Sequence, residues 1–131
     1  MPLYQQIIMA LPKAPKDVLV KLFRNHTKTI LDHGGNVRGI ENHGVKPLAE
    51  RTKRKFATQD GTRYFWEARF ITTTFDASPD CLIYINRMLQ NEDGYIRVFT
   101  KKLDSGLDKV TTATYKNPYF EKPANVKPRN Y

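Results

Sequence analysis

Residues Arg63–Thr100, RYFWEARFITTTFDASPDCLIYINRMLQNEDGYIRVFT, are the most informative about the fold because they predict a strand, a helix and a second strand in succession. Aromatic and β-branched residues dominate 63–73, which is typical of a strand. Ser78 followed by Pro79 indicates a helix start, and apolar residues then recur at helical spacing. The turn residues that follow end this helix, and Tyr95–Thr100 alternates as a final strand.

Upstream of this stretch, the sequence predicts a strand, a helix and another strand. Leu3–Leu11 is apolar and ends at a proline, whereas 16–33 has helical periodicity and stops at Gly34-Gly35. Asn36–Asn42 alternates as a strand, which is expected to run on through a bulge or bend at Gly44 towards Leu48-Ala49. The full order is therefore β-α-β-β-α-β, which predicts an α+β, ferredoxin-like fold: a four-stranded antiparallel sheet with two helices on one face.

Length and composition fit one domain with an appendage. The chain has 131 residues and a mass of 15.2 kDa, and 40% of its residues are hydrophobic. We expect a ferredoxin-like domain over 1–102 and a basic, extended tail over 103–131. The tail carries aromatic residues among its cations, and three of them are expected to bind a partner: Tyr115, Tyr119 and Phe120. No apolar run is long enough to predict a membrane span.

The charge predicts a polyanionic partner. The 22 Lys and Arg residues exceed the 13 Asp and Glu residues, which gives a formal net charge of +9. Nucleic acid is the partner that this excess favours first. The densest cluster is Arg51–Lys55, with four cations in five positions inside the predicted loop 50–61. Such a run can be a merely solvated loop, but in a chain this basic we expect it to contact phosphates.

The sequence does not predict catalysis. Its three histidines lack metal-ligand spacing, and His26 is expected to pack against the apolar stripe of its helix. Cys81 lies in the first turn of the second predicted helix and is expected to be a small helix-face residue. No glycine-rich phosphate loop is present, nor any spacing typical of a ferredoxin-like acyl-phosphate hydrolase. We therefore expect no enzyme activity, no cofactor or metal, and no small-molecule substrate.

The aromatic residues of 63–70 leave two interpretations open. They are similar to the stacking strand of an RNA-recognition motif, although that motif's glycines are missing. A free-standing RNA-binding module that uses these aromatics is therefore an alternative function. The interpretation that we favour is that one alternate set packs beneath the helices, either Tyr64, Trp66, Ala68 and Phe70 or Phe65 and Ile71.

Three stretches carry a resemblance to a known family. Leu3-Tyr4 opens the first predicted strand, GGNVRGIENHGVKPLA spans 34–49, and INRMLQNEDGYIR spans 85–97. In this order and spacing they resemble the bacterial-type ribosomal protein S-six family, the sixth protein of the small subunit, over about 1–102. The Arg51–Lys55 run and the tail depart from the family's minimal pattern, which suggests a lineage-specific, mitochondrial form; a bacterial or plastid ribosome is the alternative.

The resemblance implies a structural protein of the small-subunit platform. Such a protein would bind the central domain of the small-subunit rRNA beside ribosomal protein S-eighteen and take part in translation without a cofactor. Together with the charge pattern, it predicts cations that contact rRNA: Arg38, Lys46, Arg51, Lys53, Arg54, Lys55 and Arg97. The tail and an edge or open face of the sheet would bind neighbouring proteins.

Overall fold

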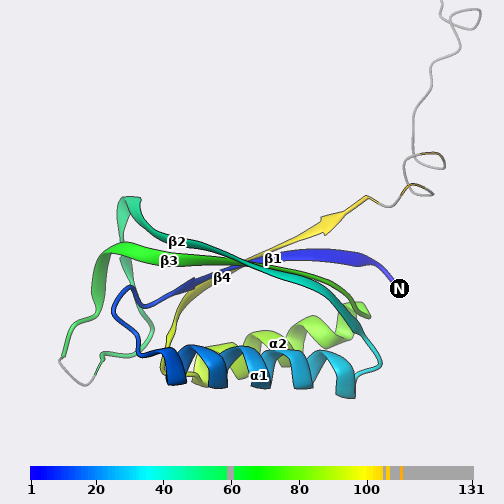
Figure 1. Ribbon diagram of the computed structural model, residues 1–131, viewed down its shortest axis with the longest axis horizontal. Coiled ribbons are helices and arrows are strands. Elements are labelled where there is room, and N and C mark those ends of the chain that lie inside the picture. The colour runs from blue at the N-terminus through cyan, green and yellow to red at the C-terminus, as the bar shows by residue number, and fades with distance from the viewer. Residues whose placement is uncertain (59–60, 105, 107–109, 111–131) are drawn as a thin grey trace, which may run out of the picture.

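The computed structural model describes residues 1–58, 61–104, 106 and 110, and it has a helix layer packed on one sheet (Figure 1). The predicted order β-α-β-β-α-β is confirmed. The elements are β1 (Leu3–Ala10), α1 (Lys16–Asp32), β2 (Asn36–Lys53), β3 (Tyr64–Asp76), α2 (Pro79–Asn91) and β4 (Tyr95–Leu103). Both helices lie on the same side of the sheet, as the ferredoxin-like prediction requires.

The sheet has the strand order β2-β3-β1-β4, and every neighbouring pair is antiparallel. Burial alternates strictly along β1, from half-buried Leu3 to fully buried Ala10. The buried set of β1 faces the helices, and the other set belongs to the opposite face, called the open face below. Because opposite residues of a ladder share a face, the register assigns every paired strand residue to one of the two faces.

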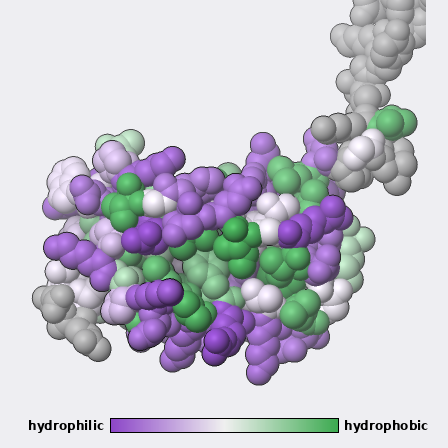
Figure 2. Space-filling model, viewed as in Figure 1, coloured by the Kyte–Doolittle hydropathy of each residue, from purple (hydrophilic) through white to green (hydrophobic). Residues whose placement is uncertain are grey.

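The hydrophobic core lies between the sheet and the two helices. Phe75 of β3 is completely buried at its centre, and its ring lies 6.0 Å from the ring of Tyr4, centroid to centroid. Both helices contribute from one stripe, as their periodicity predicts. The core residues are Tyr4, Ile8, Leu22, Ile30, Phe75, Ala77, Cys81, Ile85, Leu89 and Tyr95. On the outside, hydrophilic side chains surround smaller groups of exposed hydrophobic ones (Figure 2).

Local signals set the helix ends where the sequence predicts them. Gly34 has a φ of +77°, and the amides of Gly34 and Gly35 donate to the carbonyls of Leu31 and Ile30, which closes α1. A Cβ at Gly35 would lie 2.5 Å from the carbonyl oxygen of Asp76, so this position has no room for a side chain. Ser78 precedes α2 as predicted, but its side chain makes no capping hydrogen bond.

The second strand differs from its prediction in length and in phase. It continues past Ala49 to Lys53, and its pairing with β3 shifts at three places, one of them at the predicted Gly44 bend. Another shift lies between Val37 and Gly39, so these two residues lie on opposite faces and not on one face as strict alternation would require. As a result, β2 and β3 form a long hairpin whose end extends beyond the start of α1 (Figure 1).

Candidate nucleic-acid interface

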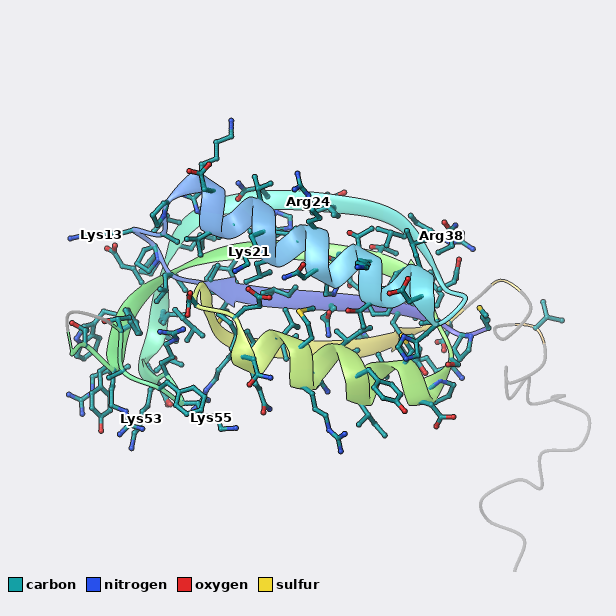
Figure 3. The ribbon with its side chains drawn as sticks, turned by 90° about the horizontal axis from the view of Figure 1, so that it is seen from below. Lys13, Lys21, Arg24, Arg38, Lys53 and Lys55 are labelled. Carbon is teal, nitrogen blue, oxygen red and sulfur yellow. The ribbon has the colours of Figure 1, made fainter. Side chains whose placement is uncertain are left out.

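Exposed cations gather at the end of the β2–β3 hairpin. We call the described residues of 46–58 and 61–68 the hairpin end. Lys53 and Lys55 lie together there (Figure 3), and both are exposed, as is Arg51. The guanidinium carbon of Arg51 lies 4.2 Å from the centroid of the Tyr64 ring, and Lys53 Nζ lies 6.0 Å from the same centroid. The ring therefore holds two cations at the protein surface.

Arg54, the remaining cation of the Arg51–Lys55 run, has a different environment. It is only 8% exposed, and its guanidinium donates to three backbone carbonyls in the turn between α2 and β4. Nε donates to Tyr95 O at 2.7 Å, and one terminal nitrogen donates to both Glu92 O and Asp93 O. Arg54 was predicted to contact RNA, but in the structure its side chain is buried and hydrogen-bonded within the protein.

The other predicted RNA-binding residues do not lie in one place. Arg38 lies at the far end of the sheet from Lys53 (Figure 3), where its Nε donates to Asp76 Oδ2 at 2.7 Å. Lys46 pairs with Ala68 within the hairpin end, and Arg97 lies on the open face at the opposite edge strand, β4. All three side chains are exposed. The three predicted partner-binding aromatics of the tail lie outside the described residues.

The aromatic residues of β3 divide between the two faces. Phe70 pairs with Met9 on the open face, so Trp66 and Tyr64 lie on that face too, with 65% and 44% exposure. Ile71 is buried toward the helices, and Phe65 is half-buried. Of the two sets that the sequence left open, Phe65 with Ile71 is the one directed toward the helices, and the set of Tyr64, Trp66, Ala68 and Phe70 belongs to the open face.

Sequence reasoning missed an apolar group at the centre of the open face. Ile7, Met9 and Phe70 are half-buried there, and Phe99 of β4, which pairs with Ile7, is 62% exposed. The signal was present as the alternate residues of two strands, but only the register shows which alternate set is uncovered. This face is apolar at its centre and basic at its hairpin end.

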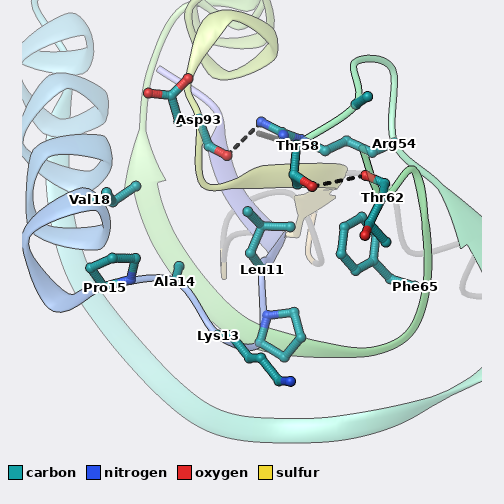
Figure 4. Close-up of a pocket in the computed structure, with 12 residues that line it drawn as sticks. Leu11, Lys13, Ala14, Pro15, Val18, Arg54, Thr58, Thr62, Phe65 and Asp93 are labelled. Atoms are coloured by element: carbon teal, nitrogen blue, oxygen red, sulfur yellow. Dashed lines mark hydrogen bonds between the residues drawn. The ribbon is translucent and has the colours of Figure 1, made fainter. Parts of the chain in front are cut away.

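A groove of about 580 Å³ separates the hairpin end from the start of α1 (Figure 4). Leu11, Pro12, Pro15, Val18 and Phe65 supply most of its apolar lining. Two of its polar side chains are already engaged nearby: Thr58 Oγ1 donates to Thr62 O, and Arg54 binds the α2–β4 turn. The described lining is therefore an apolar surface with three charged residues, Lys13, Arg54 and Asp93.

Two titratable side chains, His26 and Cys81, are buried in the core. His26 is fully buried, as predicted, and its Nε2 lies 2.7 Å from Gln6 Oε1; burial lowers the pKa of His26 to about 4. Cys81 is buried in α2, where desolvation raises the pKa of its thiol. Within the described ranges, no three metal-binding side chains cluster, and no helix is long and apolar enough to cross a membrane.

Comparisons with known proteins agree with this architecture. The family model described as Ribosomal protein S6 matches residues 3–102. A curated relative, small ribosomal subunit protein bS6 of Methylobacterium radiotolerans, is 25% identical over 104 residues, which are 79% of this chain and 61% of that protein. This chain thus spans less than two thirds of that relative's length. The crystal structure of 30S ribosomal protein S6 from Thermotoga maritima matches with a TM-score of 0.63 at 17% identity, covering 86% of this chain and 96% of that one, and supports the fold.

Proposed function

Because this chain belongs to the ribosomal protein S6 family, we propose that it is a structural, non-enzymatic constituent of the small ribosomal subunit whose hairpin end contacts rRNA phosphates. The observation that carries the RNA contact is the exposure of Arg51, Lys53 and Lys55 at the end of one hairpin. Phosphate contacts of this kind position a protein on RNA without reading its sequence.

Charge density supports this assignment. Over 46–68 the sequence has six Lys or Arg residues against three Asp or Glu residues, so about a third of the net charge of +9 lies in less than a fifth of the chain. Arg54, buried beneath this surface, anchors the loop to the α2–β4 turn and holds its neighbours outward. A fixed set of cations loses less conformational freedom on binding phosphates than a mobile one.

The proposed partners follow from the two chemically different parts of the open face. The basic hairpin end suits rRNA, and the apolar centre around Phe70 and Phe99 suits a neighbouring small-subunit protein. We propose ribosomal protein S-eighteen for that neighbour and the central domain of the small-subunit rRNA for the RNA, as the family implies. The tail, with Tyr115, Tyr119 and Phe120, is proposed to bind a further partner protein.

The proposed location is the mitochondrial ribosome, with a bacterial or plastid ribosome as the alternative. The support for this is the dense Arg51–Lys55 run together with the basic tail after residue 102, where the match to the family model ends. Separating mitochondria from the other fractions of source cells, followed by detection of the protein with an antibody, decides between the locations.

Charge reversal at the hairpin end tests the RNA contact. We expect Arg51→Glu/Lys53→Glu/Lys55→Glu to weaken binding to a central-domain rRNA transcript and to lower the slope of log affinity against log salt by about three, because three phosphate contacts are lost. The measurement is a filter-binding titration between 50 and 300 mM KCl.

The matched control is Lys21→Glu/Arg24→Glu/Lys28→Glu, which makes the same change in net charge on exposed positions of α1. It is expected to reduce affinity through long-range electrostatics with a smaller change in slope. Equal slopes for the two triple variants would refute the hairpin assignment.

A further inference from the structure

We propose that Trp66, with Tyr64 beside it, is a stacking site for an unpaired base of RNA. The inference rests on the proposed function, but it assigns a different kind of contact to a different kind of residue. The cations of the hairpin end would hold the phosphates on either side, and the indole of Trp66 would receive the base between them. Such stacking accepts any base, because every base has an aromatic face.

The exposure of Trp66 is the first observation. Its side chain is 65% exposed near the start of β3, where the register gives it neither a helix to pack on nor a partner residue on β2. Burying a large aromatic side chain is favourable, so leaving it in water forgoes stabilisation that the strand could have gained. A flat apolar surface held on a strand is what a base requires for stacking.

The surroundings of Trp66 are the second observation. Tyr64 lies two residues away on the same face and carries Arg51 above its ring, and Lys46 pairs with Ala68 on the other side of Trp66 along the strand. Cations therefore lie on both sides of the indole. Glu67 is exposed but belongs to the opposite face of β3, and Glu50 is the acidic residue of β2 at the hairpin end.

Charge selects RNA over a protein as the occupant. At the centre of a protein–protein interface, Lys is typically rare and aromatic residues lie among apolar ones. Met9 and Phe70 at the middle of the open face fit that description. Trp66 is instead placed among Lys46, Arg51 and Lys53. An aromatic surface among cations is complementary to a single strand with its bases and phosphates.

The test uses the fact that Trp66 is the only tryptophan of the chain. The full chain is titrated with a single-stranded decamer of oligoadenylate RNA and with an abasic decamer of the same charge. We expect the RNA to quench the Trp66 emission and to bind roughly ten-fold more tightly than the abasic strand. In Trp66→Leu this ratio should fall close to one, whereas Trp66→Phe should keep most of it.

The control is Tyr84→Leu, which removes another exposed aromatic ring, 50% exposed and stacked on His33, from α2 on the other layer. It should keep the wild-type ratio, and thermal melting should confirm that all variants fold. The proposal is overturned if Trp66→Leu still binds the RNA decamer more tightly than the abasic one, or if the wild type binds neither decamer. It is also overturned if Trp66→Leu weakens only incorporation into the small subunit, because a protein contact would have that effect. If the triple charge reversal at the hairpin end leaves the affinity for the RNA decamer unchanged while Trp66→Leu lowers it, the phosphate contact is refuted and the stacking site is supported.

Discussion

Arg54→Met is expected to lower the free energy of unfolding by about 3 kcal/mol and the melting temperature by roughly 10 °C. The guanidinium is buried and satisfies three carbonyl oxygens, two of them directly after α2. No basic residue lies in the last turn of α2, so Arg54, the residue after β2, supplies the positive charge that this helix end favours. Urea unfolding followed by circular dichroism measures the loss.

Two further variants separate burial from charge. Arg51→Met removes the same charge from an exposed position of the same run and should cost under 1 kcal/mol. Arg54→Lys keeps the charge but cannot reproduce the three-way geometry, so its stability should lie between those of wild type and Arg54→Met. Equal stabilities for Arg51→Met and Arg54→Met would show that the buried anchor contributes nothing.

Lowering the pH from 7 to 5 is expected to cost the protein about 2 kcal/mol of stability through His26 alone. Gln6 Nε2 donates to Thr100 Oγ1 at 3.0 Å, so Gln6 Oε1 accepts from His26 Nε2. His26 Nδ1 is buried without a partner, and a proton placed there would have no acceptor. Burial therefore lowers the pKa of His26 from 6.5 to about 4.

The direction of the effect follows from this lowered pKa. The unfolded chain binds the proton as the pH falls below 6.5, whereas the folded chain resists it down to about 4. The stabilisation is thus complete above pH 6.5 and is lost between 6.5 and 4. In urea titrations at pH 7 and pH 5, His26→Gln should lose most of this pH dependence, and His33→Gln, on the protein surface, should retain it. An unchanged pH dependence in His26→Gln would contradict the assignment.

Much of the fold was predictable because local signals agree with one another along the chain. Gly34-Gly35 ends α1 with a left-handed residue, and Ser78-Pro79 opens α2, so the element order followed directly. The length and phase of β2 were not predictable, because the shifts at Val37/Gly39 and Pro47/Thr52 depend on its pairing with β3. A bulge inserts one residue and reverses the face of everything beyond it.

The candidate site was predictable in composition but not in arrangement. Arg51, Lys53, Arg54 and Lys55 are equivalent as a charge run, yet only Arg54 is buried, because the α2–β4 turn happens to lie beneath it. That contact joins residues about 40 positions apart, which no local pattern reveals. The exposure of Trp66 could not be predicted either, since an aromatic residue in a strand is usually buried in the core.

Sedimentation tests whether the protein is a member of the small ribosomal subunit. Native lysate of cells that express the tagged full chain is separated on a sucrose gradient, with and without RNase treatment. We expect the protein to migrate with the small subunit and to leave those fractions when RNase destroys the rRNA. Migration as a free species of 15.2 kDa in both gradients would contradict it.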